Sequence, residues 1–522
     1  MQLASIFRHL GLALALATAP AGPALAQTIV PVTVQAGNSN LFISKDIQGQ
    51  FAEHLGRCIY GGFWAEPGLN VPQQGRIRLD IVEALKKIHV PNLRWPGGCF
   101  ADTYHWHDGV GPTAQRPKML NLWWGNTLED NSFGTYEFLE LCQLLGTTPY
   151  LAANVGSGTV QEMSNWMEYL NSNEDTPMVL ERRKNGHPEP YKVSWWGIGN
   201  ESWGCGGNMT ADYYTNVYKR YATFAHDYPG TKLRKIVSGA NGDDANWTET
   251  CMKNIGPDKM WGLTLHYYTL PTGSWSGSKG KATGFGEDQY FSTLRNCLKM
   301  DAIVAKHAAI MDKYDKDKKV ALLVDEWGVW TDVEPGTNPG FLYQQNTLRD
   351  ALVAGTTLNI FNNHCDRVKG ANLAQAVNVL QALVLTDKEK MLLTPTYHVF
   401  DLYQVHQDAE FLPLQFTSPE YTFGGEKIPA LNASASKDKN GAVHLSLVNL
   451  DPHHALTLEA ALPGVSWKTV TGRVLTSANV SDYNTFDKPN TIKLATFTGA
   501  KKRGDKLAVT LPAKSVVMLE LK

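Results

Sequence analysis

The stretch VALLVDE, residues 320–326, is an apolar run that ends in two neighbouring carboxylates. A short apolar run of this kind is typical of a strand buried on both faces of a parallel sheet. Seven further runs share its character, and most are bounded by Gly, Pro or Asn: residues 47–51, 90–95, 148–154, 194–201, 235–241, 262–268 and 359–363. The sequence therefore predicts eight parallel strands, with residues 320–326 as the seventh.

Amphipathic helical patterns alternate with these runs, for example at residues 80–88, 136–145, 211–225, 294–314 and 344–354. Each parallel strand needs a crossover connection to the next one, and a helix is the usual crossover. Eight such units predict an α/β fold, a closed (β/α)8 TIM barrel. A doubly wound open sheet is the alternative, but the sequence contains no G-x-G-x-x-G or phosphate-binding loop to support it.

The sequence pattern changes after residue 395. Alternating apolar and polar residues, separated by turn residues, predict an antiparallel β-sandwich, with strands at residues 443–450, 456–461, 491–497 and 516–521. We therefore predict a catalytic barrel over residues 47–395 and a C-terminal β-sandwich over residues 396–522. Residues 27–46 contain an alternating run, residues 28–34, that we expect to join the β-sandwich as an additional strand.

Residues 1–26 have the pattern of a secretory signal peptide. Arg8 and His9 precede an apolar stretch, residues 10–18, that is too short to span a bilayer as a stable anchor. Residues 24–26, Ala-Leu-Ala, fit an A-x-A cleavage site that would leave Gln27 as the first residue. An uncleaved membrane anchor is the alternative. The pattern predicts a secreted or periplasmic protein with no membrane attachment after cleavage.

Charge and cysteine content limit the expected partners. The formal net charge is −2, so we expect neither nucleic acid nor an anionic membrane, which both require a basic surface. The seven cysteines form no C-x-x-C pair and no zinc-ligand spacing. Their odd number leaves at least one free thiol in a monomer, and one disulfide is compatible with export.

Ionisable residues concentrate where the predicted strands end, and barrel enzymes build their active sites at those ends. Glu201 ends the fourth run, in WWGIGNE, and Glu326 ends the seventh, in ALLVDEW. Strands four and seven face each other across a barrel, so their carboxylates can flank a scissile glycosidic bond, about 5–5.5 Å apart in a retaining enzyme. A structural ion pair is the alternative for either Glu alone. The presence of both Glu201 and Glu326 favours the catalytic interpretation. Asn200 supports it, because its amide can hydrogen-bond a sugar 2-hydroxyl.

Six motifs together resemble glycoside hydrolase family 51, which is dominated by α-L-arabinofuranosidases. They are GQFAEHLGRCIYGG (49–62), NLRWPGGCFADTYHWHDGVGP (92–112), WWGIGNESWG (195–204), LHYY (265–268), DEWGVW (325–330) and ANLAQAVN (371–378). The motifs follow the order of the family and cover nearly the whole chain after the predicted signal. The resemblance implies a (β/α)8 barrel with a C-terminal β-sandwich, a retaining mechanism, no metal and no cofactor.

The resemblance also implies roles for individual residues. Glu201 corresponds to the catalytic acid/base and Glu326 to the nucleophile. Glu53 corresponds to a carboxylate that hydrogen-bonds hydroxyls of the arabinofuranose, and Asn200 to the ligand of the 2-hydroxyl. Arg94 corresponds to a buried cation beside the nucleophile, where a fixed positive charge would keep a carboxylate ionised.

Further residues complete the implied sugar site. Tyr268, in an H-x-Y pattern with His266, corresponds to a phenol that contacts the nucleophile, and the adjacent Tyr267 is an equally open alternative. Gln375 corresponds to an amide ligand that follows the eighth strand. Cys99 follows the PGG turn and is expected to line the site.

Two other groups of residues have competing interpretations. His105, His107 and Asp108 are potential metal ligands, but backbone groups easily satisfy histidines on an extended segment, and no third His lies nearby in the sequence. Several tryptophans follow predicted strand ends and can stack on sugar rings, although core packing is the alternative for each: Trp123, Trp124, Trp203, Trp327 and Trp330.

The predicted function is an exo-acting, retaining α-L-arabinofuranosidase that releases arabinose from arabinoxylan, arabinan or their oligosaccharides through a covalent glycosyl-enzyme intermediate. A retaining endoglucanase or xylanase on the same barrel is the alternative, and it would need an open groove in place of a pocket. A non-catalytic carbohydrate-binding protein is a more remote alternative. The expected partner is the arabinose-substituted carbohydrate, and a homo-oligomer is open by analogy alone.

Overall fold

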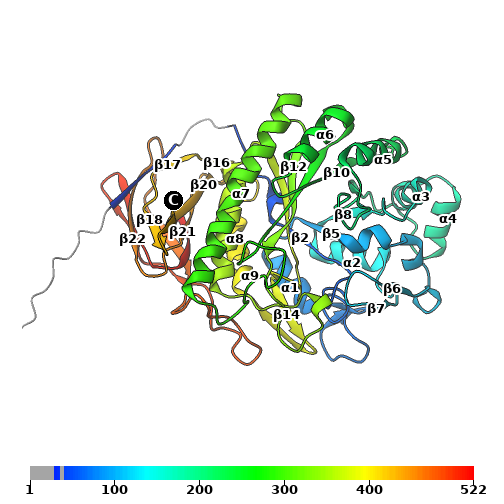
Figure 1. The fold of residues 1–522 in the computed structure, drawn as a ribbon, viewed down its shortest axis with the longest axis horizontal. Helices are drawn as coiled ribbons and strands as arrows, with labels where there is room; N and C mark the ends of the chain where they lie inside the picture. The colour runs from blue at the N-terminus through cyan, green and yellow to red at the C-terminus, as the bar shows by residue number, and fades with distance from the viewer. Residues whose placement is uncertain (1–28, 36–39) are drawn as a thin grey trace, which may run out of the picture.

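The computed structural model describes residues 29–35 and 40–522, and its centre is a closed barrel of parallel strands (Figure 1). The barrel strands follow one another around the ring in chain order: β2 (Gly49–Phe51), β5 (Asn92–Trp95), β8 (Thr148–Ala153), β9 (Trp195–Ile198), β10 (Arg234–Asn241), β11 (Gly262–Thr269), β12 (Ala321–Val329) and β13 (Val368–Leu373). The predicted (β/α)8 barrel is confirmed. The predicted signal peptide, residues 1–26, lies outside the described residues.

Helices connect the strands: α1 (Leu79–Lys87), α2 (Thr135–Leu145), α3 (Val160–Asn171), α4 (Pro177–Lys184), α5 (Ala211–Thr223), α6 (Ala245–Ile255), α7 (Glu287–Tyr314), α8 (Leu348–Asn363) and α9 (Pro395–Tyr403). Threonines begin several of them. The side chains of Thr159, Thr176 and Thr210 each accept a hydrogen bond from a backbone N–H in the first turn of α3, α4 and α5. Such caps satisfy donors that a helix start leaves without an intrahelical partner.

The eighth strand is not where the sequence predicted it. Residues 359–363 form the end of helix α8, and β13 follows five residues later. Helix α8 is buried along almost its whole length because it lies between barrel strand β12 and a C-terminal sheet that contains β20 (Leu431–Lys437) and β21 (Val443–Asn449) (Figure 1). The helical pattern predicted at residues 344–354 covers the start of α8, but the five residues that end the helix are too few to show a helical period.

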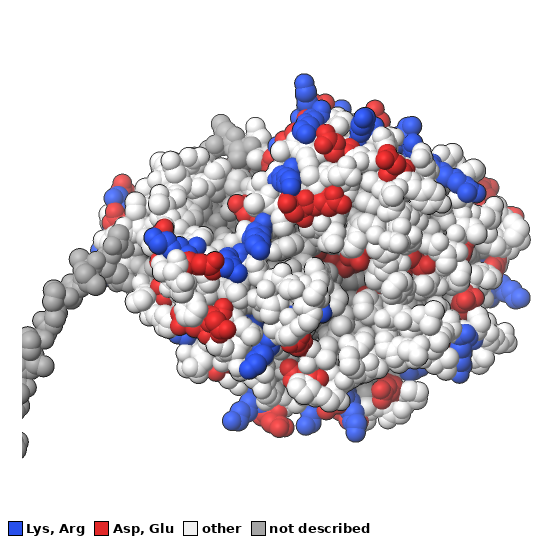
Figure 2. All heavy atoms as spheres, in the orientation of Figure 1, with Lys and Arg blue, Asp and Glu red and all other residues white. Residues whose placement is uncertain are grey.

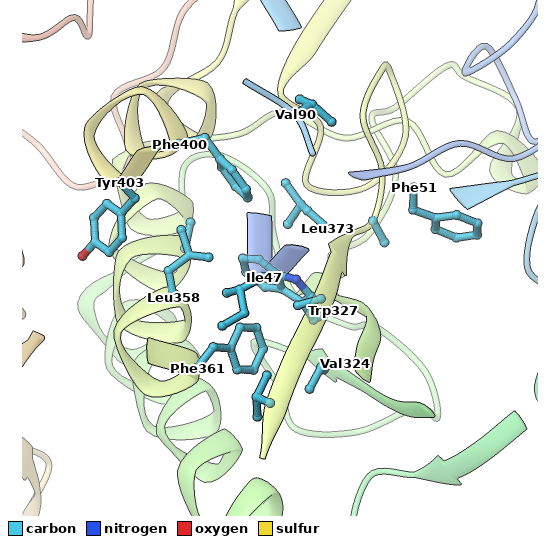
Figure 3. Packing of buried hydrophobic residues seen from close by; sticks show 14 of the residues in the cluster. Ile47, Phe51, Val90, Val324, Trp327, Leu358, Phe361, Leu373, Phe400 and Tyr403 are labelled. Carbon is cyan, nitrogen blue, oxygen red and sulfur yellow. The ribbon is translucent and has the colours of Figure 1, made fainter. Parts of the chain in front are cut away.

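Trp327 anchors the end of β12 in the core between the barrel and helices α8 and α9 (Figure 3). Its ring packs edge-on against Phe361 at a centroid distance of 5.6 Å and stacks with Phe400 at 6.3 Å. The interpretation of Trp327 as a sugar-stacking residue is therefore wrong, since its side chain is fully buried on the outer side of the barrel wall. This packing fixes the backbone directly after Glu326.

The C-terminal domain contains two sheets of mainly antiparallel strands. One has the order β17 (Leu414–Phe416), β1 (Ile29–Val34), β22 (Leu456–Ala461), β26 (Lys506–Leu511) and β25 (Ala500–Arg503). The other has the order β16 (Glu410–Phe411), β20 (Leu431–Lys437), β21 (Val443–Asn449), β27 (Ser515–Leu521), β23 (Val470–Leu475) and β24 (Ala495–Thr496). Strand β1 thus comes from the beginning of the chain, and it pairs in parallel with β22.

The predicted strand at residues 491–497 is wrong for most of its length, because only Ala495–Thr496 pairs with a neighbouring strand. The backbone N–H and C=O of Ile492 instead bond to the side chain of Asn484. The alternating pattern arises because the Ile492 side chain is buried without belonging to a sheet.

Four short hairpins complete the structure: β3 (Gln73–Gln74) with β4 (Ile77–Arg78), β6 (Met119–Asn121) with β7 (Thr127–Glu129), β14 (Val384–Asp387) with β15 (Lys390–Leu393), and β18 (Glu420–Phe423) with β19 (Glu426–Pro429). Among the described residues, no helix combines the length and the apolar character that crossing a membrane requires. Acidic and basic side chains are interspersed on the face seen in Figure 2, as the small net charge predicts.

Candidate active site

A cavity of about 270 Å³ lies at the carboxyl ends of the barrel strands, where barrel enzymes form their active sites. Most of the predicted site residues form its wall: Glu53, Cys99, Glu201, His266, Tyr268, Glu326 and Gln375. Arg94 and Asn200 lie buried behind this wall, where Arg94 donates to Glu326 and to Asn200. The structure thus brings together side chains that the sequence distributes over six strands.

The two central carboxylates, Glu201 and Glu326, approach each other closely. Glu201 follows β9 and Glu326 lies near the end of β12. A carboxylate oxygen of each, together with a ring nitrogen of His266, belongs to a group whose atoms all lie within 4.8 Å of one another. Retaining glycosidases hold their carboxyl groups about 5–5.5 Å apart, whereas inverting enzymes need about 6.5–9.5 Å. The observed approach fits the retaining arrangement.

A bulge in β12 adds a carboxylate that the sequence analysis missed. Neighbouring residues of a regular strand point to opposite faces, yet Asp325 and Glu326 both contact Arg94. The pairing of β12 with β13 shifts register between Val324 and Trp327, which lets two successive side chains face the barrel interior. The sequence gives no sign of this bulge, so Asp325 could be recognised only by its position beside Glu326.

Two donors hold the carboxylate of Glu326. Arg94 Nη1 donates to Oε1 at 2.8 Å, and the phenol of Tyr268 donates to Oε2 at 2.8 Å. The hydroxyl of Tyr267 instead donates to the backbone C=O of Asn296 at 2.7 Å, on the α7 side of the strand. Of the two neighbouring tyrosines, Tyr268 therefore contacts Glu326. Such charge-assisted hydrogen bonds stabilise the negative charge and fix the direction of the carboxylate.

The surroundings of Glu201 favour its protonated form. Burial raises the pKa of Glu201, the negative charge of Glu326 raises it further, and the hydrogen bond with His266 opposes both. The net pKa of Glu201 lies above its usual value. A raised pKa favours the protonated carboxyl that a general acid needs to deliver a proton to a leaving group.

His266 links three carboxylates. Its Nδ1 lies 2.8 Å from Glu201 Oε1 and 3.6 Å from Glu326 Oε2, and its Nε2 lies 3.1 Å from Asp325 Oδ1. Burial lowers the pKa of His266, but the charge of Glu326 and the hydrogen bonds with Asp325 and Glu201 raise it to about 10. His266 is therefore a buried cation at neutral pH, and it fixes the orientation of Glu201.

Glu53 organises the opposite side of the cavity. Its Oε1 accepts from Trp124 Nε1 at 2.8 Å and from two backbone N–H groups of the loop after β5, and its Oε2 accepts from Gln375 Nε2 at 3.0 Å. Burial and the charge of Glu326 raise the pKa of Glu53 to about 7, against these hydrogen bonds. The side chain thus positions Trp124 and Gln375 on the cavity wall.

The PGG turn after β5 allows the side chains of Glu53 and Glu326 to approach the backbone. A Cβ on Gly98 would lie 2.7 Å from Glu326 Oε1, and a Cβ on Gly97 would lie 2.5 Å from Glu53 Cγ. Neither distance is compatible with a side chain, so glycine is required at both positions for the observed geometry.

Asn200 is oriented by Arg94. Arg94 Nη2 donates to Asn200 Oδ1 at 2.6 Å, which leaves the amide nitrogen of Asn200 as the group available to a ligand. That nitrogen lies 3.8 Å from Cys205 Sγ.

Aromatic side chains surround the cavity entrance. Trp124, Trp203 and Trp330 line it as predicted, whereas Trp123 does not. Trp275, which the sequence analysis missed, lines it too and is 53% exposed, with its ring edge-on to Trp330 at a centroid distance of 5.3 Å. Leu342 and Leu380 add apolar surface. Trp203 and Trp330 belong to two of the sequence motifs, whereas Trp275, Leu342 and Leu380 lie outside all six.

A disulfide joins Cys99 to Cys205 across two of the active-site loops, with a Cα–Cα distance of 5.4 Å. Cys99 lies on the cavity wall, and its pairing could not be read from the sequence. The remaining cysteines are buried free thiols: Cys58, Cys142, Cys251, Cys297 and Cys365.

His105 and His107, the potential metal ligands, contact different helices. His105 Nδ1 contacts Glu162 at 3.0 Å and His107 Nε2 contacts Glu181 at 2.8 Å. Each histidine therefore has a separate carboxylate partner, one on α3 and the other on α4.

Comparisons with known proteins agree with this geometry. Residues 84–291 match the family model of the α-L-arabinofuranosidase 1 domain, and residues 325–515 match that of the α-L-arabinofuranosidase C-terminal domain. An intracellular exo-α-L-arabinofuranosidase from Bacteroides ovatus is 52% identical over 95% of this chain and 96% of its own length.

Two solved structures are similar over almost the whole chain. The crystal structure of a GH51 arabinofuranosidase from Xanthomonas axonopodis pv. citri has a TM-score of 0.93 and 47% identity, over 95% of this chain and 100% of that one. An arabinose complex of an α-L-arabinofuranosidase from Thermotoga maritima has a TM-score of 0.82 and 32% identity, over 94% and 99%.

The prediction of a secreted or periplasmic protein is contradicted by these comparisons, because the Bacteroides ovatus relative is named intracellular. The prediction relied on a short apolar stretch followed by small residues, within a segment outside the described residues. Such a pattern reflects only hydrophobicity and side-chain size, and these properties alone do not determine where a protein is located.

Proposed function

The chain belongs to glycoside hydrolase family 51 and is an exo-acting α-L-arabinofuranosidase, and on this premise we propose that Glu201 and Glu326 release arabinose by a retaining double displacement. The observation that carries the proposal is the approach of the two carboxylates to within 4.8 Å. That separation leaves no room for the water molecule that an inverting enzyme places between its catalytic base and the sugar.

In the first step, the ionised Glu326 attacks the anomeric carbon while Glu201 donates its proton to the glycosidic oxygen. The bond from the anomeric carbon to the leaving oxygen breaks as the ester bond to Glu326 forms. Arg94 and Tyr268 orient Glu326 for this attack through their hydrogen bonds to its two oxygens. The raised pKa of Glu201 supports its role as the proton donor.

In the second step, Glu201 accepts a proton from water, which attacks the anomeric carbon and releases Glu326. Esterification removes the charge of Glu326, which is one of the causes that raise the pKa of Glu201. The same carboxyl can therefore act as an acid first and as a base afterwards.

The sugar hydroxyls have polar partners on the cavity wall. We assign Glu53 and Gln375, which line the cavity, to hydroxyls of the arabinofuranose, together with the amide nitrogen of Asn200, whose oxygen is occupied by Arg94. Cys99 and His266 complete the wall. A volume of about 270 Å³ is at the small end of ligand cavities, which supports a pocket for one pentose and not a groove for a polysaccharide chain.

The substrate class follows from the shape of the entrance. Aromatic rings stack on the apolar faces of sugars, and the tryptophans around the cavity offer such faces outside the pentose pocket. We propose that the natural substrates are arabinose side groups of arabinoxylan, arabinan or their oligosaccharides, with the remainder of the substrate on the tryptophans. As a glycoside hydrolase, the protein has a carbohydrate as its substrate, whichever of these polymers is the natural one.

Proton NMR during hydrolysis of an arabinoxylo-oligosaccharide and an arabino-oligosaccharide tests this proposal. We expect free arabinose whose first-formed anomer is α, since two displacements at the anomeric carbon retain its configuration. A β anomer as the first product would contradict the role of Glu326 as nucleophile. Release from an aryl α-L-arabinofuranoside but from neither oligosaccharide would contradict the substrate class alone.

Tyr268→Phe should lower kcat/KM by about 10- to 100-fold, because a hydrogen bond to a charged group contributes about 1.5–3 kcal/mol. Steady-state hydrolysis of an aryl α-L-arabinofuranoside measures this effect. Tyr267→Phe is the matched control, since its hydroxyl bonds to Asn296 and not to Glu326, and it should retain the activity of the parent protein. A larger loss in Tyr267→Phe than in Tyr268→Phe would reverse the assignment.

A further inference from the structure

The disulfide between Cys99 and Cys205 forms part of the catalytic pocket wall. Cys99 begins the 3-10 helix η2 (Cys99–Thr103), and Cys205 lies in the turns that follow Glu201. The Sγ atom of Cys205 is 3.5 Å from Glu201 Oε2, and Cys99 lines the cavity. Both cysteines are only half-buried, so a small reagent in the cavity reaches the disulfide.

The same three residues have the atoms of a metal site. The Sγ atoms of Cys99 and Cys205 and a carboxylate oxygen of Glu201 all lie within 4.8 Å of one another. Two thiolates, one carboxylate and one water molecule satisfy the tetrahedral coordination of Zn²⁺, and thiolates select soft and borderline metals. While the disulfide is intact, neither sulfur is a thiolate, and the set of ligands is incomplete.

Reduction supplies the missing ligands. A water-soluble phosphine attacks one sulfur of the disulfide and is oxidised to the phosphine oxide, with the oxygen and the two thiol protons supplied by water. The sulfur–sulfur bond breaks and two thiols form. A divalent metal then displaces both protons, because metal ligation requires the thiolate form.

We propose that reduction of the Cys99–Cys205 disulfide converts this part of the pocket wall into a binding site for Zn²⁺ or a similar thiophilic divalent cation, with Glu201 as the third protein ligand. A Glu201 carboxylate bound to a cation carries no proton for a leaving group, so the bound metal blocks hydrolysis. The inhibition rests on the proposed acid/base role of Glu201, whereas the binding of the metal does not.

A second group of ligand atoms lies nearby but is less suited to a cation. It comprises Glu201, His266 and Glu326. Arg94 contacts Glu326 at 2.8 Å, and His266 is itself held as a cation by the surrounding carboxylates. An added divalent cation there would meet two fixed positive charges, whereas the cysteine side of Glu201 offers two thiols that ionise on binding.

Cobalt titration of the full-length protein tests the proposal. The protein is stripped of metal with EDTA and divided into an oxidised sample and a phosphine-reduced, desalted sample. Co²⁺ stands in for Zn²⁺ because its thiolate complexes absorb in the near ultraviolet. We expect this absorption to saturate at one equivalent of Co²⁺ in the reduced sample and to be absent from the oxidised sample, which contains the same five buried thiols.

Activity of the same samples gives a second readout. Zn²⁺ should lower hydrolysis of an aryl α-L-arabinofuranoside by the reduced protein about 10²-fold, the scale of a lost general acid, and EDTA should restore it. The oxidised protein should respond to neither. Metal binding that leaves hydrolysis unchanged would support the metal site and contradict the role of Glu201.

Variants locate the site. The double variant Cys99→Ser/Cys205→Ser should give no thiolate absorption in either sample, with circular dichroism to verify its fold. Cys142→Ala, which removes a buried free thiol in helix α2, should retain the absorption of the reduced parent protein. The proposal is overturned if the reduced parent protein gives no absorption, or if the absorption persists in the double variant.

Discussion

Glu326→Ala is expected to lower kcat for an aryl α-L-arabinofuranoside by about 10⁵-fold, the scale of a lost catalytic nucleophile. Without this carboxylate, no ester to the sugar can form, and the oxocarbenium-like transition state loses its nearest negative charge. Steady-state kinetics with protein purified free of the parent enzyme measures the loss. Glu389→Ala, which removes an exposed carboxylate in the β14–β15 turn, is the matched control and should retain full activity.

Added azide sharpens this test. The alanine variant opens space beside the anomeric carbon, so azide should occupy the place of the carboxylate and form the β-arabinofuranosyl azide, with rescue of the rate. Glu326→Gln keeps the volume of the side chain, and we expect weaker rescue because its amide fills that space. An α azide from Glu326→Ala would show that another residue is the nucleophile.

Glu201→Ala is expected to lower the rate by about 10²- to 10⁴-fold for an arabino-oligosaccharide, whose leaving alcohol needs a proton. An aryl glycoside with an acidic phenol should lose far less in the first step and should accumulate the glycosyl-enzyme, visible as a burst of phenol and as added mass. Comparison of the two substrates by pre-steady-state kinetics and mass spectrometry measures this difference.

The pH profile provides an independent readout for Glu201. Its pKa is raised, and the first step needs its protonated form, so kcat/KM of the parent enzyme should fall as the pH rises through that pKa. The alkaline limb should be absent from Glu201→Ala. An equal loss on both substrates, with the alkaline limb retained, would contradict the assignment of Glu201 as the acid/base.

Much of the barrel and the placement of Glu201 and Glu326 at its strand ends could be predicted because short-range patterns encode them. The run ending in Glu326 is apolar over the length of one strand, and the strand β12 begins and ends close to it. Glu201 was recognisable for the same reason at the end of β9. Side chains at the carboxyl ends of parallel strands converge, so their meeting follows from the topology once the strands are known.

The parts that could not be predicted depend on contacts between distant residues. The end of helix α8 was predicted as a strand because five residues are too few to show a helical period, and the Asn side chains there bond to strand β20, far along the chain. The contact of Asp325 with Arg94 depends on a bulge. The partner of Cys99 and the place of Trp275 at the pocket entrance depend on how separate loops meet. Contacts between distant residues leave no local periodicity or motif in the sequence.

Strand β1 also constrains how the chain can be synthesised and folded. It lies between β17 and β22, so that Val30 pairs with Leu458. Strand β1 is synthesised before the barrel strands, whereas both of its partners are translated only after the whole barrel. The backbone donors and acceptors of β1 can form their sheet hydrogen bonds only during the last quarter of translation. Pairing between strands so far apart in sequence also carries a large loop-closure cost. Completion of this sheet is therefore a late event in biogenesis, and until then β1 is an exposed template for intermolecular pairing and aggregation.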